Sequence, residues 1–173
     1  MTEMNWPDGV QIREMRAADG AEVWALIERA GTLDQNSPYL YLMLGRYFGD
    51  TCLVAERDGH MLGFTTGFVP PRDPQTVFLW QVGTDPQARG LGIGKLLVRA
   101  LVEQPATASA RFLETTVTPS NKPSRALFES FARSMNAPLR VLPGFPEALF
   151  PQHQPHETEE LLRIGPLERE PEG

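Results

Sequence analysis

The sequence predicts an α/β fold of the α+β kind, in which a mixed, mostly antiparallel central sheet carries helices on both faces. The first observation is the order of the segments: strand, two helices, three strands, helix, strand, helix and two strands. The second is the Asp-Gly pair at 58–59, which predicts a hairpin. The third is a glycine-rich turn between a strand and a helix. Together they favour helices packed around one mixed sheet.

The first half of the chain begins with a polar stretch at 1–9, which is expected to be a flexible tail. Asp19 followed by Glu22 resembles a capping box and predicts the start of a helix. Apolar residues then follow helical spacing up to Gly31, which is expected to end that helix. The other predicted elements of this half are strand 10–15, loop 32–38, helix 39–48, and strands 51–56 and 61–68.

The second half opens with a proline-rich stretch at 70–74, which must be a loop because proline cannot pair inside a sheet. A helix from residue 91 carries its apolar residues on one face, and Asn121 is expected to cap a last helix. The other predicted elements are strands 76–83, 111–117, 139–142 and 161–164, with a proline-rich connector at 143–155. A single domain is therefore expected over 10–167, followed by a tail at 168–173.

The composition is that of an ordinary globular protein: 41% of the 173 residues are hydrophobic and 22% are charged. The net charge of −6 argues against a nucleic-acid-binding protein, which usually carries basic patches. The single cysteine, Cys52, excludes an internal disulfide and fits a reducing cytoplasm. The chain shows neither a signal pattern nor an apolar run of membrane-spanning length, so we expect no membrane contact.

The glycine-rich turn at 85–95 is the most informative stretch, with glycines at alternate positions from Gly90 to Gly94. Glycine allows tight turning and close approach to a ligand, and the following helix offers N–H groups and a positive dipole end. Strand, turn and helix therefore predict a cradle for an anion such as a pyrophosphate. A P-loop is excluded because Leu96, rather than a hydroxyl residue, follows Lys95, and the dinucleotide motif Gly-x-Gly-x-x-Gly is absent.

The motif Arg89-x-x-Gly92-x-Gly94 resembles the signature of the GCN5-related N-acetyltransferases (GNAT), and the order of elements is that of their fold. The resemblance implies that acetyl-CoA binds here without a metal. Backbone groups near Val82 and Thr84 would pair with the pantetheine arm, and the N–H near Val82 would polarise the thioester carbonyl. The residues that the resemblance assigns to the cofactor are Val82, Gly83, Thr84, Arg89, Gly90, Leu91, Gly92, Ile93, Gly94, Lys95, Asn121 and Phe128.

Phe128 departs from this family's pattern. Many members carry a tyrosine there, seven residues after Asn121, as proton donor to the leaving thiolate. Phenylalanine cannot donate a proton, so Tyr39 or a water would serve instead, or the thiolate would leave unassisted. The last route is chemically reasonable because a free thiol has a pKa near ~8.5.

Four further segments resemble the L-2,4-diaminobutyrate N-acetyltransferases of ectoine biosynthesis. They are residues 31–39, Trp80-Gln81-Val82, 115–121 and 156–166, in the right order along nearly the whole chain. The resemblance implies transfer of an acetyl group from acetyl-CoA to the 4-amino group of L-2,4-diaminobutyrate. Ectoine is a compatible solute made in the cytoplasm under osmotic stress. A homodimer is also implied.

Such an acceptor carries two amines and one carboxylate, so its site needs acidic groups and a hydrogen-bond donor. The candidates for substrate binding are Asp34, Asn36, Tyr39, Trp80 and Glu114, and those for catalysis are Asp34, Glu157, His156 and Tyr39. Transfer requires a neutral amine, although an alkylammonium has an ordinary pKa near ~10.4. The base is open between Glu157, His156, Asp34 and a water chain. The alternatives are a turn role for Asp34, core packing for Trp80 and a solvated loop for His156 and Glu157.

Three other functions compete with this reading. The first is an acetyltransferase that acts on another small amine, such as a polyamine, an aminoglycoside or an amino acid. The second is a protein N-terminal or lysine acetyltransferase, which needs an open groove that the loop at 32–39 and the tail should close. The third is a non-catalytic CoA-binding sensor, which turnover would exclude.

Overall fold

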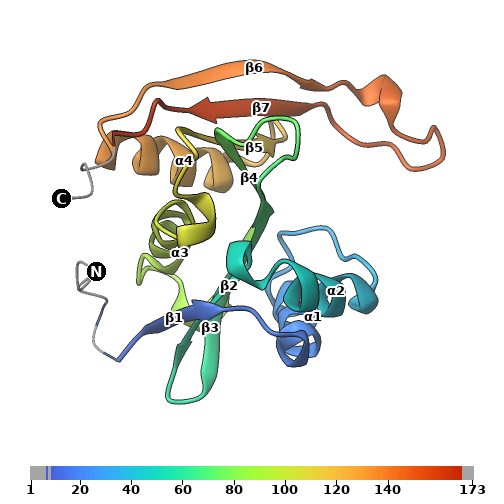
Figure 1. The fold of residues 1–173 in the computed structure, drawn as a ribbon. Helices are drawn as coiled ribbons and strands as arrows, with labels where there is room; N and C mark the ends of the chain where they lie inside the picture. Colours follow the sequence, from blue (N-terminus) through green and yellow to red (C-terminus); the bar gives the residue numbers. More distant parts are fainter. Residues whose placement is uncertain (1–6, 8, 169–173) are drawn as a thin grey trace. The chain divides into compact units, whose positions relative to one another are not determined.

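The computed structural model describes residue 7 and residues 9–168 (Figure 1). It divides into a first unit, Met1–Phe68 with Leu79–Ala108, and a second unit, Val69–Phe78 with Ser109–Gly173. Strand β4 (Thr76–Thr84) begins in the second unit and ends in the first. The tails expected at 1–9 and 168–173 lie almost entirely outside the described residues, and the single domain expected over 10–167 stays a prediction.

The first unit is built on strands β1 (Gln11–Glu14), β2 (Leu53–Arg57) and β3 (His60–Phe68), followed in the strand order by β4. β1 pairs antiparallel with β2, and β2 pairs antiparallel with β3. The turn between β2 and β3 has positive φ at Asp58 (51°) and Gly59 (77°). Two consecutive positive φ angles match the twist of a two-residue hairpin, so the Asp-Gly prediction is confirmed.

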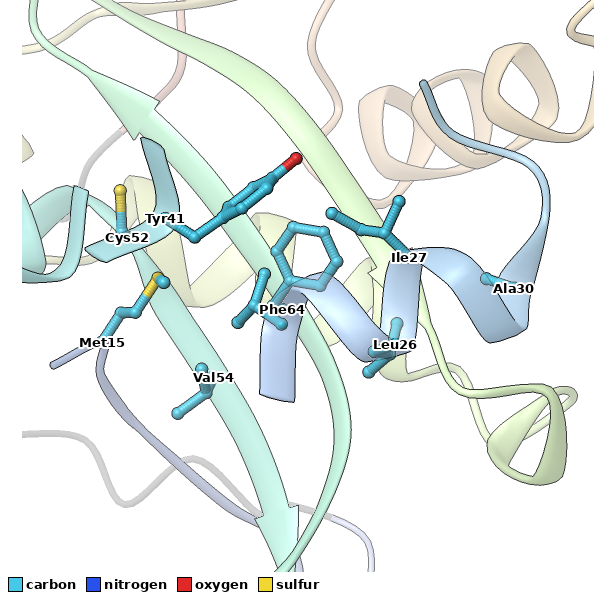
Figure 2. Packing of buried hydrophobic residues seen from close by; sticks show 9 residues of the cluster. Met15, Leu26, Ile27, Ala30, Tyr41, Cys52, Val54 and Phe64 are labelled. Atoms are coloured by element: carbon cyan, nitrogen blue, oxygen red, sulfur yellow. The ribbon is translucent and has the colours of Figure 1, made fainter. Parts of the chain in front are cut away.

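Helices cover both faces of this part of the sheet. Successive residues of a strand point to opposite faces. Phe64 on β3 packs into the buried cluster with Leu26 and Ile27 of α1 (Gly20–Ala30), as Figure 2 shows. Its neighbour Gly63 faces α3 (Ile93–Val102), where a Cβ would lie 2.9 Å from Ile93. The predicted placement of helices on both faces is therefore confirmed within this unit.

The buried cluster of the first unit also takes in Cys52 and Tyr41 of α2 (Pro38–Tyr47) (Figure 2). Cys52 is fully buried, and burial raises its pKa to about 11. It therefore behaves as a small apolar core residue. Tyr41 is also fully buried, and its ring meets that of Phe64 edge to face at 6.4 Å. A phenol at this depth needs a hydrogen-bond partner.

The second unit begins with the parallel pairing of β4 with β5 (Phe112–Val117). β7 (Glu159–Ile164) then pairs antiparallel with both β5 and β6 (Leu139–Phe145), so β6 is the outer strand (Figure 1). Helix α4 (Lys122–Ser134) completes the unit. Of the described strand pairs with stated directions, one is parallel and the others are antiparallel. The predicted mixed, mostly antiparallel sheet is confirmed.

The end of β6 and the start of α3 differ from the prediction. β6 runs on through Pro143 to Phe145, where a connector was expected. An outer strand tolerates a proline at the register shift between Leu142 and Phe145, because no ladder hydrogen bond is lost there. Helix α3 begins at Ile93 rather than residue 91 because the backbone is still left-handed at Gly92. The short 3₁₀ helices are η1 (Ala17–Asp19), η2 (Gly49–Thr51), η3 (Pro86–Ala88), η4 (Pro105–Thr107) and η5 (Glu147–Leu149).

The capping box expected at Asp19 is wrong. Asp19 precedes α1, but its side chain makes no cap hydrogen bond to that helix. It accepts instead from the Arg16 N–H at 2.7 Å and from the Arg13 guanidinium at 2.8 and 2.9 Å. The Arg13 contact lowers the pKa of Asp19. The carboxylate therefore serves the start of η1 and the charge-assisted contact with Arg13, and it is not available to the N–H groups of α1.

None of the described helices is long and apolar enough to span a membrane.

Candidate functional site

The glycine turn is anchored to the first unit at its start. The Asp85 N–H donates to the Leu62 carbonyl at 2.8 Å, and the Asp85 side chain accepts from the Gln87 N–H at 2.9 Å. The backbone is left-handed at Gly90 (φ 82°) and Gly92 (φ 73°), and a Cβ at either position would meet nothing within 4 Å. These glycines are therefore required by backbone conformation and not by packing. The open space leaves the turn accessible to a ligand.

Helix α3 presents its N-terminus directly after this turn. The Leu96 N–H bonds back to the Gly92 carbonyl at 3.1 Å. Helix geometry leaves the preceding N–H groups, including those of Ile93 and Gly94, without an intrahelical acceptor. These groups and the positive dipole end of α3 are what the predicted anion cradle requires, and their contact with a phosphate stays a prediction. The Ile93 side chain is buried in the core, so only its backbone is suited to contact a phosphate.

Polar side chains tie the turn to α1. The Arg29 guanidinium pairs with Asp85 at 3.0 Å and with Glu22 at 2.9 Å. The Arg89 guanidinium donates to the Ala30 carbonyl at 3.4 Å, although Arg89 itself is exposed. Arg89 thus lies beside the C-terminal end of α1, where a cation is favoured. Its predicted contact with the pyrophosphate stays a prediction.

A pocket of about 610 Å³ adjoins the turn at Ala88 and Leu91. The charged and titratable side chains that line it are Glu22, Arg29, Arg57, Asp58, His60 and Asp85. Arg29 is already paired with two of these acids. The lining therefore offers no clear excess of positive charge for a pyrophosphate, and the backbone of the turn is the better candidate.

The other predicted cofactor residues of the first unit lie on β4, in the turn before α3 and on α3 itself. Val82 and Thr84 are half-buried, as are Gly94 and Lys95, while Leu91 is exposed. Gly83 is buried, and a Cβ there would meet the Phe64 ring at 2.6 Å. The structure thus gives a packing reason for glycine at position 83, and a ligand contact through its backbone stays a prediction.

Residues 32–37, named here the acceptor loop, are fixed by side chains and not by regular structure. The Trp24 indole N–H donates to the Asn36 carbonyl at 3.0 Å. The Asp34 carbonyl accepts from the Asn36 amide at 3.2 Å and from the Gln81 amide at 3.3 Å. The Asp34 side chain is exposed and that of Asn36 is half-buried. The structure therefore brings two predicted acceptor residues, Asp34 and Asn36, into one hydrogen-bonded loop.

Sequence reasoning missed Tyr41 and Gln81 as parts of this arrangement. Tyr41 is fully buried and its hydroxyl donates to Gln81 Oε1 at 2.9 Å, while the Asn36 amide donates to that hydroxyl at 3.4 Å. In Figure 2 the hydroxyl points away from the apolar cluster. Burial raises the pKa of Tyr41, so the phenol remains a donor. The one available signal was a polar Gln81 between Trp80 and Val82 in a strand.

Trp80 and Tyr39 are the predicted aromatic residues of the first unit. Trp80 lies on β4 with 37% of its surface exposed, so the alternative that it is core packing is only partly met. Tyr39 is 67% exposed at the start of α2. Both rings are accessible enough to contact a small molecule, and their roles stay predictions.

Glu114 of the second unit is held by an arginine. It lies opposite Arg163 in the pairing of β5 with β7, and the two side chains form an ion pair. The Arg163 guanidinium also lies 3.9 Å from the centre of the Phe112 ring, a cation–π distance. Glu114 is therefore oriented, but its charge is largely compensated. A contact with a substrate ammonium would have to share the carboxylate with Arg163.

Glu157 and His156 are also engaged within the second unit. The Glu157 carboxylate accepts from both the N–H and the hydroxyl of Ser120. The His156 ring stacks on Phe150 at 4.2 Å, with Nε2 3.6 Å from Glu159. Its Nδ1 lies 2.7 Å from the Glu157 carbonyl, so that nitrogen carries the proton. Glu157 thus joins the C-terminal segment to the residue before Asn121.

Asn121 caps α4 as expected: its side-chain oxygen accepts from the Ser124 N–H at 3.2 Å. The predicted CoA contact of Asn121 stays a prediction. Phe128 lies about two helical turns after Asn121 on α4 and is 2% exposed. A side chain so deeply buried without a polar group is suited to packing, which fits its inability to supply a proton.

The described residues include no group of three or more His, Cys, Asp or Glu side chains placed to hold a metal ion.

The comparisons with known proteins agree with this geometry. The model of the acetyltransferase (GNAT) family matches residues 20–132. The L-2,4-diaminobutyric acid acetyltransferase of Halalkalibacterium halodurans is 42% identical over 158 residues, which are 91% of this chain and 82% of that protein. The same enzyme of Shouchella clausii is 46% identical over 149 residues, 86% of this chain and 83% of the relative.

Solved structures agree with the sequence relatives. The diaminobutyrate acetyltransferase of Paenibacillus lautus, in complex with its substrate L-2,4-diaminobutyric acid and coenzyme A, matches with a TM-score of 0.87 and 44% identity. The match covers 93% of this chain and 97% of that one. Ard1 from Thermoplasma volcanium matches with a TM-score of 0.73 at 16% identity, over 91% of this chain and 98% of that one, which shows the fold alone.

Proposed function

Because this chain belongs to the GNAT acetyltransferases, and within them to the L-2,4-diaminobutyric acid acetyltransferases, we infer that it transfers the acetyl group of acetyl-CoA to L-2,4-diaminobutyrate. The acceptor nitrogen is the 4-amino group, which makes the reaction an early step towards ectoine. The observation that carries this conclusion is a likeness that runs along nearly the whole of both chains to an enzyme solved with this substrate and coenzyme A.

The turn is the part of the chain that we assign to the pyrophosphate. Its left-handed glycines leave open space, and the N-terminus of α3 directs N–H groups towards it. Recognition through backbone N–H groups suits a ligand whose phosphates carry the charge. The half-buried backbone near Val82 would meet the thioester end and stabilise the developing oxyanion.

The acceptor loop is the part that we assign to the diamine. Asp34 would orient an ammonium group, while Asn36 and Tyr39 supply polar contacts and Trp80 walls the site. The amine must lose a proton before it attacks the thioester. Among the proposed bases, Asp34 lies on the acceptor loop itself and is exposed, so it is placed where the diamine is expected to bind. We therefore favour Asp34, acting directly or through water.

The leaving thiolate needs no side-chain acid in this proposal. Phe128 is buried and cannot donate, and an ordinary thiol pKa near ~8.5 allows departure as the thiolate. Tyr39, which is 67% exposed, is the alternative donor.

We also propose a homodimer in the cytoplasm. β6 is the outer strand of its sheet and exposes Val141 (51%) and Phe145 (52%). An exposed edge strand with large apolar side chains is a surface that a second copy can cover. Sedimentation at micromolar protein tests this, and a monomer there would contradict it.

The experiment that tests the function is product analysis by NMR after incubation with acetyl-CoA and L-2,4-diaminobutyrate. We expect acetate on the 4-amino nitrogen and release of one CoA per product. Acetate on the 2-amino nitrogen, or turnover of a polyamine or an aminoglycoside instead of this diamine, would contradict the assignment. Binding of CoA with no turnover of any amine would favour a sensor.

A further inference from the structure

Tyr41 and Gln81 form a buried polar pair that the proposed function leaves without a role. We propose that this pair is a positioning device, which fixes the acceptor loop so that Asp34 and Asn36 meet the diamine in one geometry. The inference rests on the proposed function, because it concerns the acceptor of that reaction. Neither side chain is expected to touch the reacting atoms.

Gln81 is held at its backbone by the neighbouring strand. The Thr65 hydroxyl donates to the Gln81 carbonyl at 3.0 Å, and the Gln81 N–H donates to the Thr66 hydroxyl at 3.2 Å. Gln81 is only 5% exposed. Its side chain therefore leaves a fixed point in the sheet, and the orientation of its amide group is the remaining freedom.

Tyr41 removes that freedom. Its hydroxyl donates to Gln81 Oε1 at 2.9 Å, and on the other side of the amide Gln81 Nε2 donates to the Asp34 carbonyl, which can only accept, at 3.3 Å. The opposite amide orientation would place Oε1 against the Asp34 carbonyl, two acceptors with no proton between them. The Tyr41 ring is itself fixed by full burial against Phe64.

The loop receives this constraint at the residues that the function needs. The Asp34 carbonyl accepts from Gln81, and the Asn36 amide donates to both that carbonyl and the Tyr41 hydroxyl. Trp24 holds the Asn36 carbonyl from α1. The loop has no helix or strand bonds of its own, so these side-chain bonds define its path. A small shift of the loop would move the Asp34 carboxylate relative to an ammonium group.

The decisive variants are Tyr41→Phe and Gln81→Met, singly and together. Tyr41→Phe keeps the ring and removes the hydroxyl that donates to Gln81 Oε1. Gln81→Met keeps the length of the side chain and removes both of its polar atoms. Thr51→Val is the matched control, because Thr51 is buried in the same unit and its hydroxyl bonds to the Phe48 and Gly67 carbonyls, outside the acceptor loop.

We expect each variant of the pair to raise KM for L-2,4-diaminobutyrate about tenfold, because the acceptor loop is no longer held in one position, with KM for acetyl-CoA unchanged. Discrimination against diamines one carbon shorter or longer should fall as well. The double variant should lose no more than either single variant, since the two residues act as one unit. Thr51→Val should lower the melting temperature to a similar extent while KM and selectivity stay at wild-type values.

Hydrogen exchange measured by mass spectrometry on the free protein gives a readout that needs no activity. We expect Tyr41→Phe to speed exchange at residues 32–37 and to leave the 57–60 turn unchanged. A lower melting temperature with unchanged KM, selectivity and loop exchange would overturn the positioning role. If the wild-type protein fails to acetylate this diamine, the proposed function fails, and loop exchange still decides whether the pair positions the loop.

Discussion

The acceptor loop of the first unit and the strands of the second unit are held by different forces. In the first unit, neutral hydrogen bonds from buried Tyr41 and Gln81 fix the acceptor loop. In the second unit, partly exposed ion pairs hold the strands and the C-terminal segment, such as Arg163 with Glu114 and Arg125 with Glu160. Buried neutral bonds are little affected by salt, whereas partly exposed ion pairs are screened. We infer that the geometry of the acceptor loop changes little with salt, whereas the ion pairs of Glu114 and Glu160 weaken as the salt concentration rises.

The glycine turn, also in the first unit, is expected to bind its ligand through backbone groups. It offers N–H groups and an open left-handed backbone rather than a cluster of basic side chains. A substitution that changes the backbone of the turn should therefore have a larger effect on ligand affinity than the loss of any single charged side chain in the second unit has on affinity or stability.

The largest expected effect comes from Gly92→Asp. The substitution places a side chain and a negative charge where φ is 73° and the pyrophosphate is expected. We predict a loss of CoA affinity of at least about a hundredfold, measured by calorimetry. Gly59→Asp is the control, since Gly59 has φ 77° and similar open space in the hairpin. Both should lose ~1 kcal/mol of stability from backbone strain, and only the first should lose CoA. Undiminished CoA binding in a folded Gly92→Asp protein would refute the cradle.

Asp34→Ala should have the next largest effect. Loss of a charge-assisted contact costs about 1.5–3 kcal/mol, or about ten- to a hundredfold in kcat/KM for L-2,4-diaminobutyrate. Affinity for CoA should stay near that of the wild type, because the turn is untouched. Steady-state kinetics with each substrate varied in turn make this measurement. Equal losses for both substrates would show that the substitution disturbs the unit as a whole.

Phe128→Leu tests the second unit without touching its charges. Phe128 is fully packed, so we expect stability to fall by about 1 kcal/mol in thermal unfolding. The value of kcat should stay within about threefold of wild type, because no proton donor is lost. Phe128→Tyr, which adds a phenol, is the complementary variant and should change the alkaline limb of the pH–rate profile if the new hydroxyl reaches the thiolate. A collapse of kcat in Phe128→Leu with unchanged CoA affinity would contradict this account.

Arg163→Met should have the smallest effect on stability, and its salt dependence should differ most clearly from that of Tyr41→Phe. It keeps an apolar side chain over Phe112 and removes the partner of Glu114. We expect a loss of less than ~1 kcal/mol in the free energy of unfolding at low salt, which disappears in ~1 M salt. Tyr41→Phe should show a stability loss that salt does not remove. If the stability loss had the same salt dependence in the two variants, the proposed difference between the neutral bonds of the acceptor loop and the ion pair of Glu114 would be wrong.

The features that sequence reasoning located are those set by neighbouring residues. The Asp-Gly hairpin, the Gly31 helix end, the Asn121 cap and the glycine turn each depend on φ angles or hydrogen bonds within a few residues. Such features are determined mainly by neighbouring residues and depend little on distant parts of the chain. The order of elements and the mixed sheet followed from hydrophobic periodicity for the same local reason.

The site was less predictable where partners are distant in sequence. Asp19 was expected to cap α1 and instead bonds to the start of η1 and to Arg13. Tyr41 reads in sequence as one more apolar position of a helix. Only the fold shows that Gln81, forty residues later, accepts the hydrogen bond of its hydroxyl.

What the sequence alone determined about this protein is the family, the fold and the glycine turn before α3, because backbone conformation and hydrophobic periodicity depend on residues that are close together in the chain. The tertiary structure decided which polar side chains meet: Tyr41 with Gln81, Glu114 with Arg163, and Glu157 with Ser120. It also gave the reason for glycine at position 83, where the Phe64 ring leaves no room for a Cβ. These pairings depend on how strands and helices pack, and packing brings together residues whose separation along the chain carries no signal of their contact.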